Sequence, residues 1–307
     1  MRIAEIKKDK RKANRRSQIY YHGMMLPGMV FVLIFCYVPM FGLVMAFQDF
    51  VPAKGFFGSE WVGLKHFKDL FATPDIWELM RNTLVIALGK IVFGILVAII
   101  FSLLLNEIKV RFLKKTVQTI VYLPHFISWV VLALVVANLF NLDGIVNQIL
   151  TFLGMEKMNF LGDNHLFQPL LIWTDVWKEF GYNSIVYLAA ITAIDPGLHE
   201  AAAIDGAGWA RRVWHVTLPG MLPIILMMAC ISISGVLSAG FDQIYNLYST
   251  LVYDTGDVLD TYIYRVGLVG RQYSFGTAVG LFKSVIGMIL MLTANGMSKR
   301  LAHRSIF

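Results

Sequence analysis

Apolar residues gather along this chain in long, nearly unbroken runs that short polar stretches separate. Five such runs cover residues 24–47, 83–105, 117–140, 219–240 and 276–298. A helix needs roughly 20 mostly apolar residues to cross the hydrocarbon core of a bilayer, and each run is long enough. The pattern therefore predicts a helical membrane protein with at least five spanning helices.

A sixth stretch, at about residues 168–193, is mostly apolar but contains Asp175, Lys178 and Glu179. A charged side chain that faces lipid at the centre of a spanning helix costs about 2.5–3.5 kcal/mol. We therefore expect this stretch to cross the membrane with its charged face turned toward protein or water. The predicted fold class is an all-α membrane protein with six transmembrane helices.

Composition supports one membrane domain over residues 24–307, preceded by a basic tail at residues 1–23. Hydrophobic residues make up 57% of the chain and charged residues 15%, against ~45–50% and ~25% in soluble domains. Of the 27 lysines and arginines, most lie in the tail and in the loops on its side of the predicted helices. Cytoplasmic loops are enriched in these residues, so both termini are predicted to be cytoplasmic. The tail is interpreted as a topology signal and not as a nucleic-acid-binding arm.

The loop before the fifth run is too polar to lie in lipid and has local signals for short helices. Asp195 and Pro196 are typical of a helix start, as N-cap and first helical residue. Gly206 and Gly208 permit a sharp turn, after which a second short helix is predicted, with Pro219 opening the fifth span. The predicted helix–turn–helix lies flat at the cytoplasmic surface. On local physics alone, it either anchors in lipid headgroups or serves as a docking surface.

The same loop, residues 195–218, carries residues at a distinctive spacing. Gly206 lies six residues after Glu200, and Leu218-Pro219 lie eighteen and nineteen residues after it. This spacing resembles the EAA loop of the transmembrane permease subunits of binding-protein-dependent ABC importers. Stretches such as "WVGLKHFKDLF", "VYLPHFISWVV" and "YSFGTAVGLFKSVIGMIL" are similar to the carbohydrate-uptake family, and especially to its LplB-like oligosaccharide permeases. The motif positions are Glu200, Ala201, Ala202, Asp205, Gly206, Leu218 and Pro219.

The resemblance implies the type I ABC importer permease fold in the cell membrane of a bacterium. The chain would form half of the pathway for a saccharide, with an oligosaccharide favoured. The implied partners are a second, different permease subunit, two ATPase subunits that bind ATP and Mg, and an extracellular or periplasmic solute-binding protein. No G-x-x-x-x-G-K-[ST] phosphate loop occurs in the sequence, so neither an ATPase site nor a cofactor is expected in this chain. The EAA loop is expected to dock in a groove of the ATPase.

The fourth predicted span combines aromatic, amide and charged side chains, a mixture typical of sugar sites. An internal salt bridge, from Asp175 to Lys178 or with Lys178 shared between both carboxylates, explains the charges equally well. The resemblance places Tyr182 and Ser232 among substrate contacts, and Ser128 less directly. The candidate pathway residues are Trp173, Asp175, Trp177, Lys178, Glu179, Tyr182, Asn183, Ser232 and Ser128.

Other polar residues in or near the runs receive simpler interpretations. Lys90 and Lys283 are expected to snorkel to the membrane surface. His125 has no partner cluster in the sequence and is not expected to be functional. The stretch at residues 238–249 lines an entrance or meets a binding protein, although an aromatic belt at the membrane interface explains its tyrosines almost as well.

Two other classes of membrane protein are alternatives to the importer hypothesis. An ion-coupled secondary transporter would use the charges of the fourth span as a relay, but would predict an internal repeat, and none is evident. A membrane-embedded enzyme would need a nucleophile with its base or a set of metal ligands. The sequence offers no such set, and its two cysteines, Cys36 and Cys230, lie inside apolar runs, so no metal site is predicted.

Overall fold

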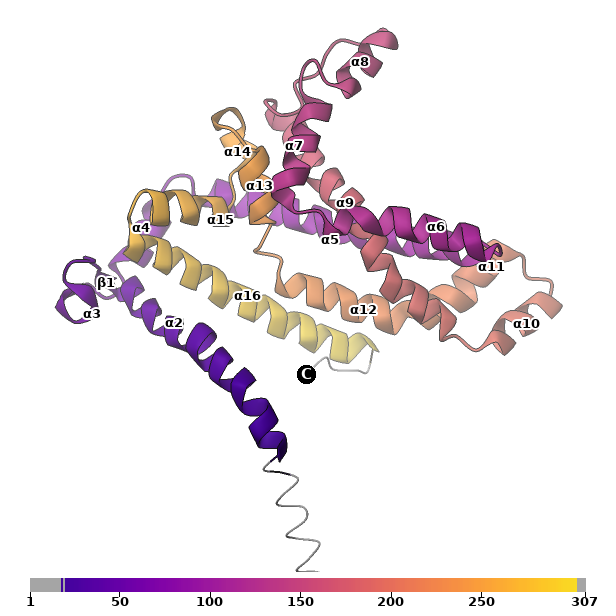
Figure 1. The fold of residues 1–307 in the computed structure, drawn as a ribbon, viewed down its shortest axis with the longest axis horizontal. Helices are drawn as coiled ribbons and strands as arrows, with labels where there is room; N and C mark the ends of the chain where they lie inside the picture. Colours follow the sequence, from indigo (N-terminus) through magenta and orange to yellow (C-terminus); the bar gives the residue numbers. More distant parts are fainter. Residues whose placement is uncertain (1–17, 19, 303–307) are drawn as a thin grey trace, which may run out of the picture.

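The computed structural model describes residue 18 and residues 20–302, and this part of the chain is mostly helical (Figure 1). The predicted basic tail lies almost wholly outside the described residues. Four long helices run along the length of the molecule: α5 (Ile76–Glu107), α9 (Asn164–Thr192), α12 (Leu218–Ser234) and α16 (Tyr273–Ala302). They form the body of the protein.

Five helices in the described residues are long and apolar enough to cross a membrane, at Tyr20–Phe47, Ile76–Glu107, Trp129–Phe152, Trp209–Ile233 and Tyr273–Gly296. Four of them overlap most of a predicted apolar run, whereas Trp129–Phe152 shares only residues 129–140 with the run predicted at 117–140. Helix α9 has 29 residues and lies beside α5 in the body (Figure 1). Its three charges distinguish it from the five, as the sequence predicts.

The third run does not form the continuous helix that the apolar pattern predicts. Helix α6 (Arg111–Tyr122) ends in a 3-10 turn, η3 (Leu123–Phe126), and α7 (Trp129–Phe140) starts after two extended residues. Ile127 and Ser128 have ψ angles of 130° and 149°, which no α-helix accommodates. Helix α7 then leaves the body at an angle to α6 and leads to α8 (Ile145–Phe152) (Figure 1). We call residues 123–128 the third-span break.

The fifth span begins earlier and ends earlier than predicted. Helix α11 (Trp209–Arg212) continues through a π-turn, η4 (Val213–Thr217), into α12, so the predicted second short helix is the start of the span itself. Pro219 lies within this helix and lacks a backbone N–H. The π-turn, in which the Leu218 N–H bonds to the Val213 carbonyl, is a common way for a helix to absorb such a local misfit.

The predicted fifth span ends in the structure at α12 rather than at residue 240. Residues 235–240, which we call the fifth-span break, connect α12 to a short helix, α13 (Phe241–Leu247). Gly240 in this segment has a φ of 96°, which favours glycine. The third and fifth apolar runs, each predicted to form a single helix, are therefore both interrupted.

Close helix packing in the body depends on two glycines. A Cβ on Gly89 of α5 would lie 2.5 Å from the Ile172 side chain of α9. A Cβ on Gly181 of α9 would lie 2.3 Å from the Val121 carbonyl oxygen of α6. Small residues at such positions let spanning helices approach closely, which is how helices associate in lipid.

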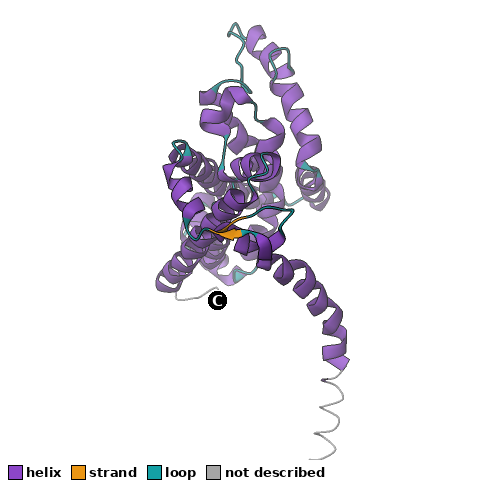
Figure 2. Ribbon diagram, turned by 90° about the vertical axis from the view of Figure 1, so that its left-hand side faces the viewer, coloured by secondary structure: helices purple, strands orange, loops and turns teal. Residues whose placement is uncertain are grey.

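The end of the molecule that carries β1 (Gln48–Asp49) and β2 (Glu60–Trp61), seen in Figure 2, is the most irregular. These strands pair antiparallel, and Lys65 closes the turn with a 2.8 Å ion pair to Asp49. The hydrogen bond from Lys65 lowers the pKa of the Asp49 carboxyl. The remaining helices and turns are η1 (Leu33–Tyr37), α2 (Val38–Met40), η2 (Phe41–Phe47), α3 (Gly55–Gly58), α4 (Lys65–Ala72), α10 (Pro196–Ile204), η5 (Thr250–Val252), α14 (Tyr253–Gly256), α15 (Leu259–Tyr262) and η6 (Ile263–Val269).

Candidate functional site

The predicted coupling loop forms a short helix, α10, at the end of the molecule opposite the strands (Figure 1). Asp195 caps it by accepting a 2.9 Å hydrogen bond from the Gly197 N–H, and Pro196 is the first helical residue. Both features confirm the predicted helix start.

Gly206 terminates α10 with a φ of 77°. Its N–H bonds to the Ala203 carbonyl and the Ala207 N–H to the Ala202 carbonyl, which is the Schellman pattern of a helix C-terminus. A Cβ at Gly206 would meet nothing within 4 Å, so the backbone conformation, and not crowding, explains the glycine. The turn predicted from the sequence is confirmed.

The motif residues are exposed at this end, except where they join the span. Glu200, Ala201, Asp205 and Gly206 are exposed and Ala202 is half-buried. Leu218 and Pro219 lie inside the helix of the fifth span instead of closing the loop. The exposed part of the motif is therefore the short helix and its glycine turn, connected to the span by a continuous helix.

The charges of α9 pair only in part as predicted. Lys178 donates hydrogen bonds to the Glu179 carboxylate at 2.6 Å and to the His125 carbonyl at 2.9 Å. The Glu179 carboxylate also lies 2.6 Å from Nδ1 of His125. The His125 ring stacks on Tyr182 with centroids 3.9 Å apart. The predicted salt bridge between Asp175 and Lys178 is wrong, and of the two carboxylates predicted to share Lys178 only Glu179 pairs with it. His125, which has no partner cluster in the sequence, contacts Glu179 and Tyr182 in the fold.

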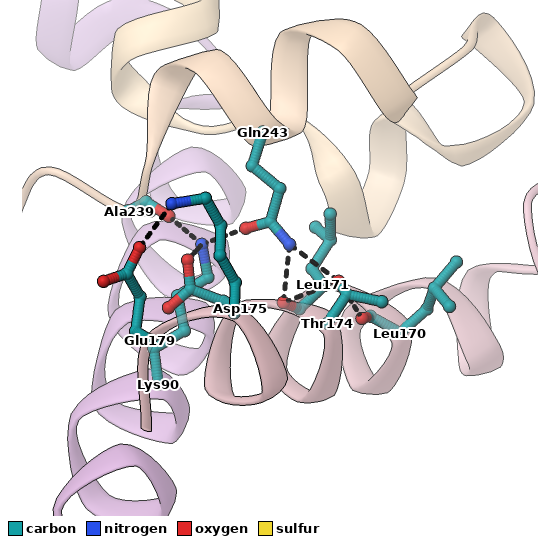
Figure 3. A network of polar contacts seen from close by, with 9 residues as sticks. Lys90, Leu170, Leu171, Thr174, Asp175, Glu179, Ala239 and Gln243 are labelled. Carbon is teal, nitrogen blue, oxygen red and sulfur yellow. Dashed lines mark hydrogen bonds and ion pairs between the residues drawn. The ribbon is translucent and has the colours of Figure 1, made fainter. Parts of the chain in front are cut away.

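Asp175 pairs with Lys90 of α5, at 3.5 Å (Figure 3). The Lys90 ammonium also donates to the Ala239 carbonyl at 2.7 Å and to the Gln243 side-chain oxygen. Its side chain is only 9% exposed, so the expected snorkelling is wrong. Helix α5 begins at Ile76 and ends at Glu107, and Lys90 is therefore about 21 Å from its start and about 26 Å from its end at 1.5 Å per residue.

Gln243 attaches the short helix α13 to α9. Its side-chain amide donates to the Leu171 carbonyl and to the Thr174 hydroxyl, both at 2.8 Å (Figure 3). Gln243 is fully buried and does not line an entrance. Tyr245, in contrast, is half-exposed and stacks against Phe241 and Tyr264.

The two interrupted spans share one arrangement. In each break a backbone carbonyl, of His125 or of Ala239, accepts a hydrogen bond from a lysine ammonium. An acidic residue of α9 pairs with each lysine. Backbone groups inside a membrane need internal partners, and buried charges need opposite charges. The lysines bond the backbone carbonyls of the breaks, and the α9 carboxylates neutralise the lysines. Helix α9 is therefore linked to both breaks.

The remaining predicted pathway residues fall on two sides of α9. Trp173 and Trp177 lie on an apolar hollow of about 410 Å³ that is shared with α7. Tyr182 is exposed beside the third-span break, where Ser128 precedes α7. Asn183 and Ser232 are half-buried. The structure thus brings Tyr182 and Ser128 to one region, together with Glu179, and separates them from the tryptophans.

A second polar feature lies at the strand end of the molecule. A cleft of about 620 Å³ is lined by Asp49 and Lys65 on one side and by Arg271 and Gln272 on the other. Arg271 has a φ of 57°, a conformation that is uncommon for residues other than glycine. Within the described residues, no group of three or more histidine, cysteine or acidic side chains is placed to hold a metal ion.

The sequence profile of the family described as "Binding-protein-dependent transport system inner membrane component" matches residues 90–305. The polygalacturonan/rhamnogalacturonan transport system permease YteP of Bacillus subtilis is 43% identical, over 98% of this chain and 95% of its own length. Protein LplB of the same organism is 39% identical, over 99% of this chain and 93% of its own length.

Two crystal structures of a bacterial importer of the acidic polysaccharide alginate have the same fold. One matches with a TM-score of 0.86 and 40% identity, covering 94% of this chain and 98% of the other. The second, in complex with a periplasmic protein that holds an alginate pentasaccharide, matches with a TM-score of 0.87 and 38% identity, covering 96% and 99%. The chain therefore belongs to the family of binding-protein-dependent transport system inner membrane components and is a multi-pass permease subunit of an ABC importer.

Proposed function

We propose that this permease forms half of the translocation pathway for an oligosaccharide, in an importer driven by ATP. The observation that carries the proposal is likeness over nearly the whole chain, at 38–43% identity, to a permease whose name specifies sugar polymers and to an alginate importer. A pathway that passes a pentasaccharide-sized substrate needs a wide polar route. The polar residues at the two helix breaks supply side chains suited to such a route.

The proposed topology has six spans, with both termini in the cytoplasm. Helix α9 is the proposed sixth span, which the length of uninterrupted apolar sequence alone does not identify because of its three charged residues. Its 29 residues exceed the roughly 20 that a span needs, and each of its charges pairs inside the protein or at a break. An even number of spans places both ends on one side, and the excess of lysine and arginine on that side favours the cytoplasm.

Helix α10 and the turn at Gly206 are the proposed contact with the ATPase subunits. They are exposed at one end of the molecule, and the continuous helix from Trp209 carries them directly into the fifth span. A movement of α10 would therefore pass through the short turn at residues 205–208 and then along this helix toward the fifth-span break. In this proposal ATP and Mg are bound by the two partner ATPase subunits and not by this chain.

A second permease subunit and a solute-binding protein complete the proposed assembly. The first helix, Tyr20–Phe47, leaves most of its apolar surface uncovered and extends away from the body (Figures 1 and 2). A different permease chain, giving a heterodimer, is the proposed neighbour of this surface. The polar cleft beside Arg271 lies at the end opposite α10, where the binding protein would deliver its sugar.

The proposed substrate route runs past the third-span break. Tyr182 is 43% exposed and stacks on His125 of the third-span break, the segment that also contains Ser128 and contacts the Glu179 carboxylate. Aromatic faces pack against the C–H surfaces of sugars, and hydroxyl and carboxylate groups bond their hydroxyls. Asn183 and Ser232 are further proposed contacts. Trp173 and Trp177, on the apolar hollow, are less suited to a polar sugar.

The test is gentle purification of the tagged chain from its native membrane, followed by reconstitution of the recovered complex. We expect a second permease and an ATPase to co-purify, and sugar-loaded binding protein to stimulate ATP hydrolysis and oligosaccharide uptake. A chain that elutes alone, from conditions that preserve other membrane complexes, would contradict the proposal. Uptake driven by an ion gradient without ATP would instead support a secondary transporter.

A further inference from the structure

The fifth-span break forms one wall of a cleft that is separate from the proposed substrate route beside Tyr182. Helix α16 forms the other wall, and the cleft has a volume of about 420 Å³. Pockets for small molecules have volumes of ~300–1,000 Å³, so the space suffices for one sugar ring. The residues that line the cleft are Gly235, Leu237, Ser238, Lys283, Ser284, Gly287, Met288 and Met291.

The cleft lies near the middle of the membrane. Lys283 follows the start of α16 at Tyr273 by ten residues, which is about 15 Å along a helix, and the hydrocarbon core is ~30 Å thick. Non-helical backbone at this depth occurs only where it is buried in protein or lines a water-filled cavity. Gly235 and Ser238 line the cleft and are not buried in protein, which is the arrangement that the second condition requires of a cleft that holds water.

A charged pair closes one side of the cleft. The Lys283 ammonium bonds to the Asp260 carboxylate of α15, and their side chains are 18% and 19% exposed. The pair is electrically neutral but keeps hydrogen-bond donors and acceptors in the membrane interior. Lys283 was expected to snorkel, and the ion pair shows that this expectation is wrong.

The other groups complement the two faces of a sugar ring. Ser284 donates its hydroxyl proton to the Gly280 carbonyl at 2.9 Å, which leaves its oxygen lone pairs as acceptors. Ser238 has no side-chain hydrogen-bond partner among the described residues. Met288 and Met291 add apolar surface for ring C–H groups. A lipid chain would use the methionines but would leave the Ser238 hydroxyl and the remaining hydrogen-bonding capacity of Ser284 and the ion pair unused.

The cleft also adjoins the polar contacts already described. Ser238 immediately precedes Ala239, whose carbonyl accepts the hydrogen bond from Lys90. The fifth-span break therefore contacts the Lys90–Asp175 pair through Ala239 and lines the cleft through Ser238. Substrate sites in membrane transporters recur at such interrupted helices near the midplane.

We propose that this cleft is a transient binding subsite for one ring of the transported oligosaccharide. Ser238, Ser284 and the Lys283–Asp260 pair would bond its hydroxyls. The proposal rests on the proposed function, because it assumes that a sugar passes through this permease. It adds a second contact region, between the fifth-span break and α16, to the one beside Tyr182.

The first test fills the cleft without disturbing the backbone. Gly235 has φ −99° and ψ 9°, and a Cβ there would lie no closer than 3.8 Å to another heavy atom. Gly235→Leu should therefore place its side chain in the cleft, whereas Gly94→Leu, at an uncrowded glycine of α5 outside the cleft, should import normally. In the reconstituted complete importer, we expect Gly235→Leu to lower oligosaccharide uptake by about tenfold, a change worth ~1.4 kcal/mol in the barrier. Co-purification of the partner subunits serves as the folding control.

The second test measures occupancy directly in the same complex. Ser284→Cys, in a background with Cys36 and Cys230 replaced by alanine, should react with a charged, water-soluble thiol reagent. Oligosaccharide-loaded binding protein together with ATP should slow this reaction severalfold, whereas unloaded binding protein with ATP should not. Thr293→Cys, at an exposed hydroxyl of the same helix outside the cleft, should show no sugar protection.

The outcomes separate this subsite from the proposed function. If the wild-type complex imports no oligosaccharide, the proposed function fails and the subsite fails with it. If the wild-type complex imports normally, then normal uptake by Gly235→Leu, or a Ser284→Cys that is unreactive or equally reactive with and without sugar, overturns the subsite alone.

Discussion

Replacing Lys90 tests whether the buried contacts of α5 hold the fifth-span break in place. The Lys90→Met substitution keeps a long apolar side chain but removes the ammonium. It deletes the hydrogen bonds to the Ala239 carbonyl and the Gln243 side chain and leaves the Asp175 carboxylate without its partner. Asp175→Asn removes the opposite charge, and the double variant removes both.

The expected magnitude follows from burial. Removing one member of a buried ion pair costs about 3–5 kcal/mol, because the other charge is left uncompensated. The Lys90 side chain is 9% exposed and that of Asp175 22%, so water relieves part of this cost. We expect Lys90→Met to lower the free energy of unfolding by about 3 kcal/mol, at the low end of that range. The double variant should be more stable than Lys90→Met, since no unpaired carboxylate remains.

The assay is a double-mutant cycle on the purified permease, followed by denaturant unfolding in detergent. Coupling of at least about 1 kcal/mol between the two substitutions is expected, as for side chains in direct contact. Effects that simply add would refute the pairing of Lys90 with Asp175. Lys157→Met is the matched control, because the Lys157–Asp143 pair is 51% and 91% exposed and such pairs contribute about 1 kcal/mol or less.

Three further substitutions test other parts of the structure. Gly206→Asp should uncouple ATP hydrolysis from uptake while the complex still assembles, and normal transport by this variant would argue against docking through α10. Gly181→Ala should lower the free energy of unfolding by about 1–3 kcal/mol, because its Cβ would lie 2.3 Å from the Val121 carbonyl oxygen; an unchanged unfolding curve would contradict the close packing of α6 and α9. Tyr182→Ala should slow uptake and leave assembly intact, and unchanged uptake at low sugar concentration would count against its place on the route.

Two glycines provide matched controls for these substitutions. Gly208 lies two residues after the coupling turn with a φ of −65°, and a Cβ there would meet nothing within 4 Å. Gly94 of α5 is equally uncrowded. Gly208→Ala and Gly94→Ala should therefore leave coupling and stability close to those of the wild type. Any large loss in either would indicate that the glycine effects above are not specific to position.

The sequence was sufficient for the features that depend on neighbouring residues. Apolar run length identified five helices, because the bilayer thickness sets the length that a span requires. Asp195 and Pro196 predicted the start of α10, and Gly206 its end, because N-caps and left-handed turns are decided by local backbone chemistry. The spacing within the EAA loop also sufficed to identify the family.

The breaks escaped prediction because apolar residues continue through them. "YLPHF" contains a proline and "SGVLSAG" two glycines, but spanning helices tolerate both residue types, so these signals alone do not show that the helix stops. The structure interrupts them where distant side chains take over the backbone hydrogen bonds. Lys178 lies 53 positions from His125, and Lys90 lies 149 positions from Ala239. Only the tertiary fold brings these groups together.

One available signal for these contacts lies in helix length. Had α5 been predicted to begin at Ile76 rather than at residue 83, Lys90 would have been placed too deep to reach the membrane surface. A buried lysine then demands a partner, and the charges of α9 were the available candidates. The partner choice itself, Asp175 for Lys90 and Glu179 for Lys178, depends on how α5 and the third-span break pack around α9.

The sequence by itself thus determined five spanning helices and the start and end of α10, since bilayer thickness and local backbone chemistry act through adjacent residues, while the resemblance to known permeases identified the family. Tertiary structure alone decided where the third and fifth spans break and which charges neutralise one another. The physical reason is that a broken helix in a membrane survives only where groups far away in the chain satisfy its backbone.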